Sequence, residues 1–409
     1  MIKNRDFLIL FFGRLITNFG DSIYLIATML LVYSLSSSSF YTGLAMFLTS
    51  STAIIQIILS PMIAKINIKK FLVLSQVMQG VLLLIIPYLQ IIGVLRVWHI
   101  LIIMPVISLL NQLVYPSQLA LLPKIVDNKD LIKANSLFSL AYQGSDAIFN
   151  FLGGIVISIL GFISAYYIDS VTFFINAILF IFLSNISVKS SEKKEKSKIT
   201  MKGYFYDLKE GLIFWKESWL KSLLVGIIFI NLAATTIYAA LPEFSEGGLY
   251  YGVLLSASGI GILVGSFSAN LEKLKNLKLG WIYISFILVV SLSWTSMVFI
   301  QRNTVFGKVL IFVLFFIGWT LIGLLNIYSQ TVIQMIVPTY KLPIVLSSMI
   351  GVSTIVAPLG ALFTSVMSKY YNIDIIILIA TIIIFIIGIY WLFSNNVRNI
   401  KSLDDMGGT

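Results

Sequence analysis

The sequence predicts an all-α membrane protein whose twelve transmembrane helices form two six-helix bundles. The first observation is composition: 58% of the 409 residues are hydrophobic, 11% are charged, and the mean hydropathy is +0.98, whereas soluble domains carry about 25% charged residues. The second is the number of apolar stretches that reach the length of about 20 residues needed to cross a bilayer. The third is a single long polar stretch near the middle of the chain, residues 188–219.

Twelve stretches are long enough to span. They cover approximately residues 7–35, 41–64, 71–92, 98–122, 135–160, 163–186, 220–241, 250–271, 279–300, 305–337, 345–368 and 373–393. The first stretch contains charges and lacks a small-x-small cleavage site, so we expect it to remain as a helix and not to be removed as a signal peptide.

The polar stretch divides the chain into an N-terminal six-helix bundle, residues 1–187, and a C-terminal six-helix bundle with a tail, residues 220–409. The linker between them is residues 188–219, and its second part, "YFYDLKEGLIFWKES", spaces its apolar side chains as on one face of a helix. This spacing favours a short amphipathic helix on the membrane surface, although a simple tether is an equally good interpretation.

The positive charges predict the orientation. If the N-terminus is cytoplasmic, 23 of the 28 Lys and Arg residues fall on the cytoplasmic side, as the positive-inside rule requires, and both termini face the cytoplasm. Membrane insertion and contact with anionic lipids then account for the net charge of +11, and no nucleic-acid partner is needed.

The residues needed for enzyme chemistry are mostly missing from the sequence. There is no cysteine, no G-x-x-x-x-G-K-[ST] phosphate loop, and one histidine, His99. A membrane enzyme acting on lipid would need a convergent nucleophile, histidine or metal cluster. We therefore expect no catalytic site, no metal and no cofactor, and we expect a monomer.

The first predicted helix carries an unusual polar face. Arg14, Thr17, Asn18 and Asp21 follow one another at helical spacing in an otherwise apolar segment, and positions i, i+3, i+4 and i+7 share one face of a helix. A charge at the bilayer centre costs at least about 2.5 to 3.5 kcal/mol on insertion scales. This face should therefore point toward a cavity or another helix, and not toward lipid.

Three other predicted helices carry comparable polar faces. These are formed by Gln143, Asp146 and Asn150 in 135–160, by Asn231, Thr235 and Tyr238 in 220–241, and by Asn326 and Gln330 in 305–337. A polar cavity where the two halves meet would keep all four faces away from lipid.

The two halves also resemble each other. Asn111 precedes Pro123 by twelve residues, and Asn326 precedes Pro338 by the same number, in each case near the end of the fourth helix of its half. Two six-helix repeats in the same orientation are typical of secondary transporters, whose substrate site lies at the repeat interface near the bilayer midplane.

Three segments carry a family resemblance: "FGRLITNFGD", "PSQLALLPKIVDNKDLIKANSLF" and "QMIVPTYKLPIVLSSMIGVSTIVAPLG". Through them the chain resembles the major facilitator superfamily, in the branch of macrolide-efflux-like and enterobactin-exporter-like proteins. The resemblance implies an exporter of the bacterial inner membrane that works by alternating access and is driven by protons. It also implies that the first, fifth, seventh and eleventh helices line the central cavity.

The resemblance further implies gating residues. The superfamily loop after the second helix reads G-x-x-x-D-R-x-x-R-K, and here "SPMIAKINIKK" places Lys65 at the aspartate position and keeps Lys69 and Lys70. The exporter motif G-P-x-x-G-G occurs as "FNFLGG", which keeps Gly153 and Gly154. Small residues of this kind allow two helices to approach closely.

The acidic residues of the polar faces are the expected proton carriers. A carboxyl group shielded from water can take up a proton near neutral pH, whereas a neighbouring arginine favours its charged form. We therefore assign proton coupling to Asp21 first and Asp146 second, with Arg14 as the modulating cation. The competing interpretation is that Asp21 only neutralises Arg14 and holds helices together. For Asp169, in the sixth helix, we expect a local hydrogen-bonding role.

The sequence thus favours proton-coupled antiport of an amphiphilic small molecule, such as a macrolide or another drug. The amide and aromatic groups of the predicted cavity suit a bulky, weakly polar solute. A siderophore exporter is the alternative, although a polyanionic siderophore would favour more than one mid-membrane arginine. A non-transporting membrane sensor or immunity protein is an alternative of another class, because Lys65 changes the usual gating loop.

Overall fold

The structure is a computed structural model. It describes residues 4–63, 67–126, 145–184, 218–269, 276–336 and 342–402, together with residues 134, 137, 138, 141, 271 and 274. For some helical residues in these ranges, Asp146 among them, only the backbone is described.

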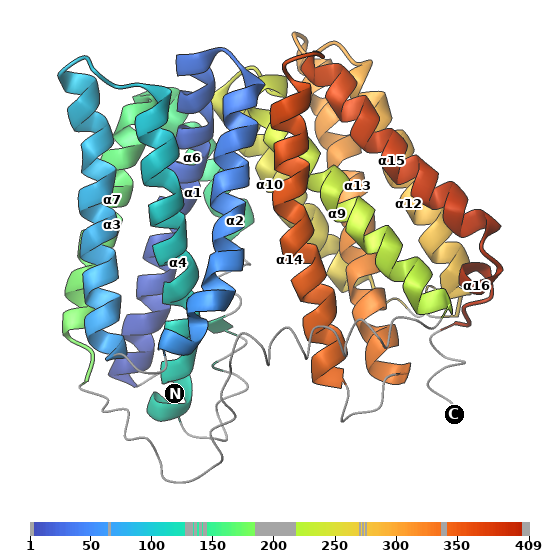
Figure 1. The fold of residues 1–409 in the computed structure, drawn as a ribbon, viewed down its shortest axis with the longest axis horizontal. Coiled ribbons are helices and arrows are strands. Elements are labelled where there is room, and N and C mark those ends of the chain that lie inside the picture. Colours follow the sequence, from blue (N-terminus) through green and yellow to red (C-terminus); the bar gives the residue numbers. More distant parts are fainter. Residues whose placement is uncertain are drawn as a thin grey trace. The chain divides into compact units, whose positions relative to one another are not determined.

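Six long helices make up the first half of the described chain. They are α1 (Arg5–Ser36), α2 (Ser39–Ile63), α3 (Ile68–Ile91), α4 (Val97–Ile125), α6 (Asp146–Leu160) and α7 (Phe162–Ile181) (Figure 1). Five of them lie within a few residues of the predicted spans. The sixth, α6, begins at Asp146, and most of the residues of the predicted span that precede it are outside the described ranges.

Six more long helices and one short helix follow. They are α9 (Ser218–Phe244), α10 (Gly248–Ser268), α12 (Leu279–Val298), α13 (Val305–Ile336), α14 (Leu342–Met367), α15 (Ile373–Phe393) and α16 (Asn395–Arg398). All regular elements among the described residues are helices, and nine of these helices are long and apolar enough to cross a membrane. The predicted all-α membrane fold is confirmed.

The chain divides into two compact units. Unit 1 comprises Met1–Ile199 and Glu246–Ser256, and unit 2 comprises Thr200–Ser245 and Ala257–Thr409. The first turns of α10 therefore belong to unit 1, whereas the polar linker in the sequence predicts one bundle for all of 220–409. The predicted linker, residues 188–219, lies outside the described residues except for its last two, so its amphipathic helix stays a prediction.

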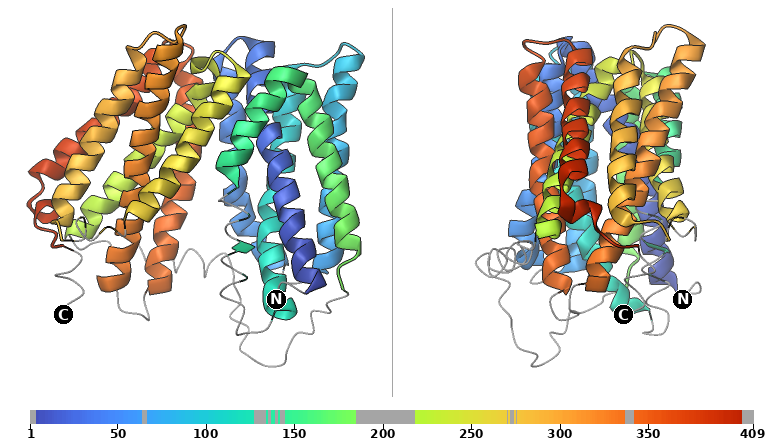
Figure 2. Two further views of the ribbon diagram at one scale, coloured as in Figure 1. Left: turned by 180° about the vertical axis from the view of Figure 1, so that it is seen from behind. Right: turned by 90° about the vertical axis from the view of Figure 1, so that its right-hand side faces the viewer.

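Helix α1 is the central helix of unit 1. It packs against α7 and α6, and the view from behind shows it between them (Figure 2). At its beginning, the Asn4 side chain accepts a hydrogen bond from the Phe7 amide and donates one to the carbonyl of Ile125, the last residue of α4. These bonds satisfy orphan groups at two helix ends. They fix the start of α1, and with it the position of the polar face two turns further on.

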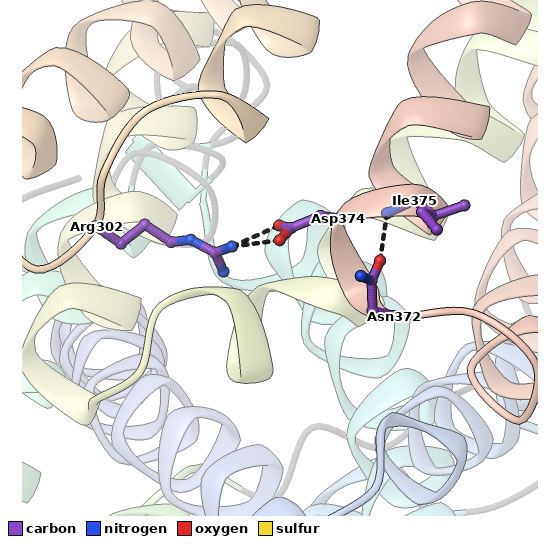
Figure 3. Close-up of polar contacts among 4 residues, drawn as sticks. All are labelled: Arg302, Asn372, Asp374 and Ile375. Atoms are coloured by element: carbon purple, nitrogen blue, oxygen red, sulfur yellow. Dashed lines mark hydrogen bonds and ion pairs between the residues drawn. The ribbon is translucent and has the colours of Figure 1, made fainter.

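Unit 2 is tied together near the start of α15. Both carboxylate oxygens of Asp374 accept hydrogen bonds from the Arg302 guanidinium, at 2.7 and 2.5 Å, and the Asn372 side chain caps the helix by accepting from the Ile375 amide (Figure 3). The Arg302 guanidinium also lies 4.5 Å from the centre of the Phe244 ring at the end of α9. Arg302 therefore joins the loop after α12 to both α15 and α9.

Candidate transport site

Unit 1 contains a cavity of about 360 Å³ that opens beside the polar face of α1. Helices α1, α2, α4 and α6 all contribute to its wall. The lining residues are Arg14, Asn18, Asp21, Ser22, Tyr24, Leu25, Thr49, Met104, Ile107, Ser108, Asn111, Gln112 and Asn150. The cavity is within the range of small-molecule sites, which are about 300 to 1,000 Å³.

Asp21 is half-buried at the wall of this cavity. Its Oδ1 accepts a hydrogen bond from Asn111 Nδ2, on α4, at 2.9 Å. Asn111 was noticed in the sequence only as part of the repeat between the two halves, and its contact with Asp21 was not predicted. A charge-assisted bond of this kind holds the carboxylate in a defined direction toward the cavity.

Arg14 is the cation of the site. Its side chain is 4% exposed, and its guanidinium lies 5.5 Å from the centre of the Tyr115 ring on α4. It is also within electrostatic reach of Asp21. The guanidinium plane and the aromatic face attract each other, more strongly where water is excluded. Arg14 thus contacts a second helix, as its position within an apolar segment predicts.

Asn18 and Thr17 are neighbours in the chain but contact different helices. Asn18 lines the cavity, and its Nδ2 donates to the Ala141 carbonyl at 2.8 Å and to Ser145 Oγ at 3.2 Å. Thr17 is not among the lining residues: its hydroxyl accepts a hydrogen bond from Asn176, on α7, at 2.6 Å. The polar stripe predicted on α1 therefore serves both the cavity and the packing against α7.

A buried polar seam, formed by Thr17, Gln76 and Asn176, joins α1, α3 and α7. Asn176 is fully buried and donates to both Thr17 and Gln76, the latter at 2.8 Å. Asp169, two turns earlier on α7, is also fully buried, and its Oδ1 accepts a hydrogen bond from Thr172 Oγ1 at 3.0 Å. The expected local hydrogen bond of Asp169 is present. The sequence analysis does not predict that Asp169 and Asn176 both point into the interior of unit 1. The signal is their spacing, because residues seven apart share one face of a helix.

The predicted residues of unit 2 occupy α9 and α13. Asn231 and Thr235 bond to backbone carbonyls of their own helix, at 2.8 and 2.7 Å. The Tyr238 ring lies 5.1 Å from that of Trp319 on α13, and its hydroxyl bonds Ser258. Asn326 and Gln330 are exposed on the surface of unit 2. A role for these five residues in substrate binding stays a prediction.

The predicted gating residues lie at two places in unit 1. Lys69 Nζ donates to the Leu183 carbonyl at 2.6 Å, whereas Lys70 is exposed at the start of α3. Gly153 packs against the backbone of α1 at Ile23, since a Cβ there would lie 3.2 Å from its Cα.

Gly154 faces the first turns of α10. A Cβ added to Gly154 would lie 3.1 Å from the Gly252 Cα, and one added to Gly252 would lie 2.7 Å from the Asn150 carbonyl oxygen. The two helices therefore touch through their backbones, which is the close packing that the small residues predicted.

Three predicted residues cannot be placed. Gln143 and Lys65 lie outside the described residues, and Asp146 begins α6 but its side chain is not described. Asn150, from the same predicted stripe, does line the cavity. Among the side chains that are described, no three of His, Cys, Asp and Glu gather in a way that could hold a metal ion.

The described helices are those of a multi-pass membrane protein, and the family model that matches the chain places it among the transporters of the major facilitator superfamily. A family model described as "Transmembrane secretion effector" matches residues 2–407, and the chain belongs to this family. Membership identifies the protein as a transporter and not an enzyme.

Two relatives in Bacillus subtilis (strain 168) are similar along nearly their whole length. The uncharacterized MFS-type transporter YvqJ is 24% identical over 402 residues, which are 95% of this chain and 92% of YvqJ. The uncharacterized MFS-type transporter YfiS is 21% identical over 410 residues, which are 97% of this chain and 94% of YfiS. Both similarities support a transporter of the same superfamily, and neither indicates a substrate.

A solved structure supports the fold. The crystal structure of a mutant of the nucleoside transporter NupG matches with a TM-score of 0.74, at 12% identity, over 95% of this chain and 100% of that chain. At this identity the likeness concerns the arrangement of helices alone. The macrolide-efflux-like or enterobactin-exporter-like branch suggested by the sequence is a finer assignment that these similarities leave as a proposal.

Proposed function

We propose that the protein is a proton-coupled exporter of an amphiphilic small molecule, and that Asp21 is its main proton-binding residue. The observation that carries the proposal is the position of Asp21: its carboxylate is at the wall of a cavity, bonded to Asn111 and within electrostatic reach of buried Arg14. A carboxyl group in such a place can be either charged or protonated. The neighbouring cation and the amide donor favour the charged form, whereas loss of contact with water favours the protonated form. Binding of a proton or a substrate can therefore favour different conformations.

The character of the cavity wall supports an amphiphilic substrate. Asn18, Asn111 and Asn150 offer amide groups, whereas Leu25 and Met104 offer apolar surface to the same space. A few polar groups among apolar side chains are typical of sites that bind small organic molecules. This wall supports the proposal of a macrolide or another drug as substrate, and Arg14, the one cation among the described residues that line the cavity, favours it over a polyanionic siderophore.

Export is supported by the family description, which names secretion. In our proposal the protein works by alternating access in the bacterial cytoplasmic membrane. Both termini face the cytoplasm and the protein acts as a monomer. Asp146 is retained as the second candidate for proton binding.

The proposal is tested in inside-out membrane vesicles with a panel of macrolides, cationic dyes and siderophores. We expect an interior-acid pH gradient to drive at least one amphiphilic compound of the panel into the vesicles, and a protonophore to prevent it. Asp21→Asn should abolish this accumulation at an unchanged level of protein in the membrane. Asp374→Asn, which removes a carboxylate from the ion pair with Arg302, is the matched control and should still accumulate the compound.

Two results would contradict the proposal. Accumulation by the Asp21→Asn variant at the wild-type rate would remove Asp21 from the mechanism. The absence of gradient-driven movement for every compound of the panel would favour the alternative of a sensor or immunity protein.

A further inference from the structure

Asp169 is a buried carboxyl group that the proposed mechanism does not use. It lies on α7 with no exposed surface, and its carboxylate abuts the backbone of α1 at Gly20, where a Cβ would overlap it. Its Oδ1 accepts a hydrogen bond from Thr172 Oγ1, and among the described residues its Oδ2 has no hydrogen-bond partner. An ionised carboxylate with one oxygen unsatisfied in a dry interior is strongly unfavourable.

The described groups around Asp169 do not supply a compensating positive charge. Helix α1 contributes Asp21, next to Gly20 in the chain, and Tyr24, both within electrostatic reach of Asp169. Of the two arginines of α1, Arg5 lies over the Phe182 ring and Arg14 is directed to the Tyr115 ring on α4.

The other described helices that pack on α7, namely α3 and α6, add no positive charge near Asp169 either. The sequence of α3 has no titratable residue between Lys70 and Tyr88, and α6 has only Asp146. The other titratable residues of α7 are Tyr166, whose hydroxyl is engaged with that of Thr28 at 3.0 Å, and Tyr167, which is exposed. A neutral carboxylic acid, with the proton on Oδ2, is the form of Asp169 that fits these surroundings.

We propose that Asp169 is a second proton-binding residue of unit 1, one that carries a proton in this conformation and exchanges it with Asp21 across the contact at Gly20. This inference builds on the proposed function, in which Asp21 is the proton carrier at the cavity. The proton leaves Asp169 Oδ2 and binds the Asp21 carboxylate, so that Asp169 becomes charged, Asp21 becomes neutral and the total charge is unchanged. The transfer requires α1 and α7 to part at Gly20, because only then can water or a donor reach the new carboxylate.

Infrared spectroscopy of the purified full-length protein at neutral pH tests the protonated state without any substrate. We expect wild type to show the carbonyl stretch of a buried protonated carboxyl group, and we expect Asp169→Asn to lack it. Asp21→Asn and the control Asp374→Asn should keep it. The proposal is overturned if wild type has no such band, if the band persists in Asp169→Asn, or if it is lost in Asp21→Asn.

A second variant covers the case in which Asp169→Asn does not fold. Thr172→Val removes the donor to Oδ1, so the band should keep its intensity and change its frequency; an unchanged frequency overturns the assignment to Asp169. Gly20→Ala tests the exchange step: it should speed the replacement of this proton by deuterium in D2O, and an unchanged rate contradicts exchange through the α1–α7 contact. Because these readouts need no transport, they can succeed even if the vesicle experiment shows no proton-driven export.

Discussion

The contact between α1 and α7 at Gly20 gives a prediction whose size can be worked out from the structure. In Gly20→Ala, the added Cβ would lie 3.1 Å from Asp169 Cγ and would overlap the Asp169 Oδ1 and Thr172 Oγ1 atoms. Both side chains are buried on the same helix, so neither can turn into open space. The two helices must separate slightly, and overpacking of this kind costs about 1–3 kcal/mol.

The assay is thermal unfolding of the purified protein in detergent. Gly247→Ala is the matched control, because it adds the same methyl group at a position where no atom lies within 4 Å. We expect Gly20→Ala to lower the apparent Tm by several degrees and Gly247→Ala to leave it unchanged or raise it slightly. Equal Tm values for the two variants would show that α1 and α7 are not in close contact at Gly20.

A double-mutant cycle assigns the effect to Asp169. In Asp169→Ala the carboxylate is gone, so the added methyl group of Gly20→Ala loses its overlap with that side chain and keeps only the one with Thr172 Oγ1. We expect the double variant to be less destabilised than the sum of the single variants, with a coupling of about 0.5–3 kcal/mol. Strict additivity would refute the reasoning, because it would mean that the methyl group and the carboxylate do not meet.

Three further predictions concern other contacts, all measured by the same unfolding assay. Asn176→Leu should destabilise the protein by about 1–3 kcal/mol, because Thr17 and Gln76 are buried and would lose their hydrogen-bond donor. The control Ile178→Ala, at an exposed position of the same helix, should have little effect. Equal losses of stability in the two variants would contradict the buried seam. Asp374→Asn should cost at most about 1 kcal/mol, because the ion pair with Arg302 is partly exposed, and the difference should shrink at high salt; a salt-independent loss would point to packing instead. Arg14→Lys should lower the free energy of unfolding by about 0.5–2 kcal/mol, because the lysine ammonium has no planar group that can stack on the Tyr115 ring. Unchanged stability would mean that the stacking contributes nothing.

Much of the fold could be predicted from the sequence because length and apolar character decide where a helix can span. The predicted ranges 279–300, 305–337 and 373–393 nearly coincide with α12, α13 and α15. The division of the chain was predicted less completely. Composition locates a polar linker but does not indicate that the first turns of α10 pack in unit 1, because that depends on the close approach of Gly252 to α6.

The site was predicted in part for the same reason. Helical periodicity places Arg14, Asn18 and Asp21 on one face, and the structure brings all three to one cavity. Periodicity does not tell which neighbouring helix a polar face meets, so Asn111 as the partner of Asp21 was not foreseen. The same limit applies to Asp169, whose contact with Gly20 depends on the packing of two helices far apart in the sequence.

The most direct test of the central claim compares net transport with exchange in Asp21→Asn, using a compound that the vesicle panel identifies as a substrate. If Asp21 couples protons to substrate movement, the variant will still exchange labelled for unlabelled compound across a liposome membrane at a rate similar to wild type, but a pH gradient will no longer drive net accumulation. Net accumulation equal to that of wild type would contradict the account.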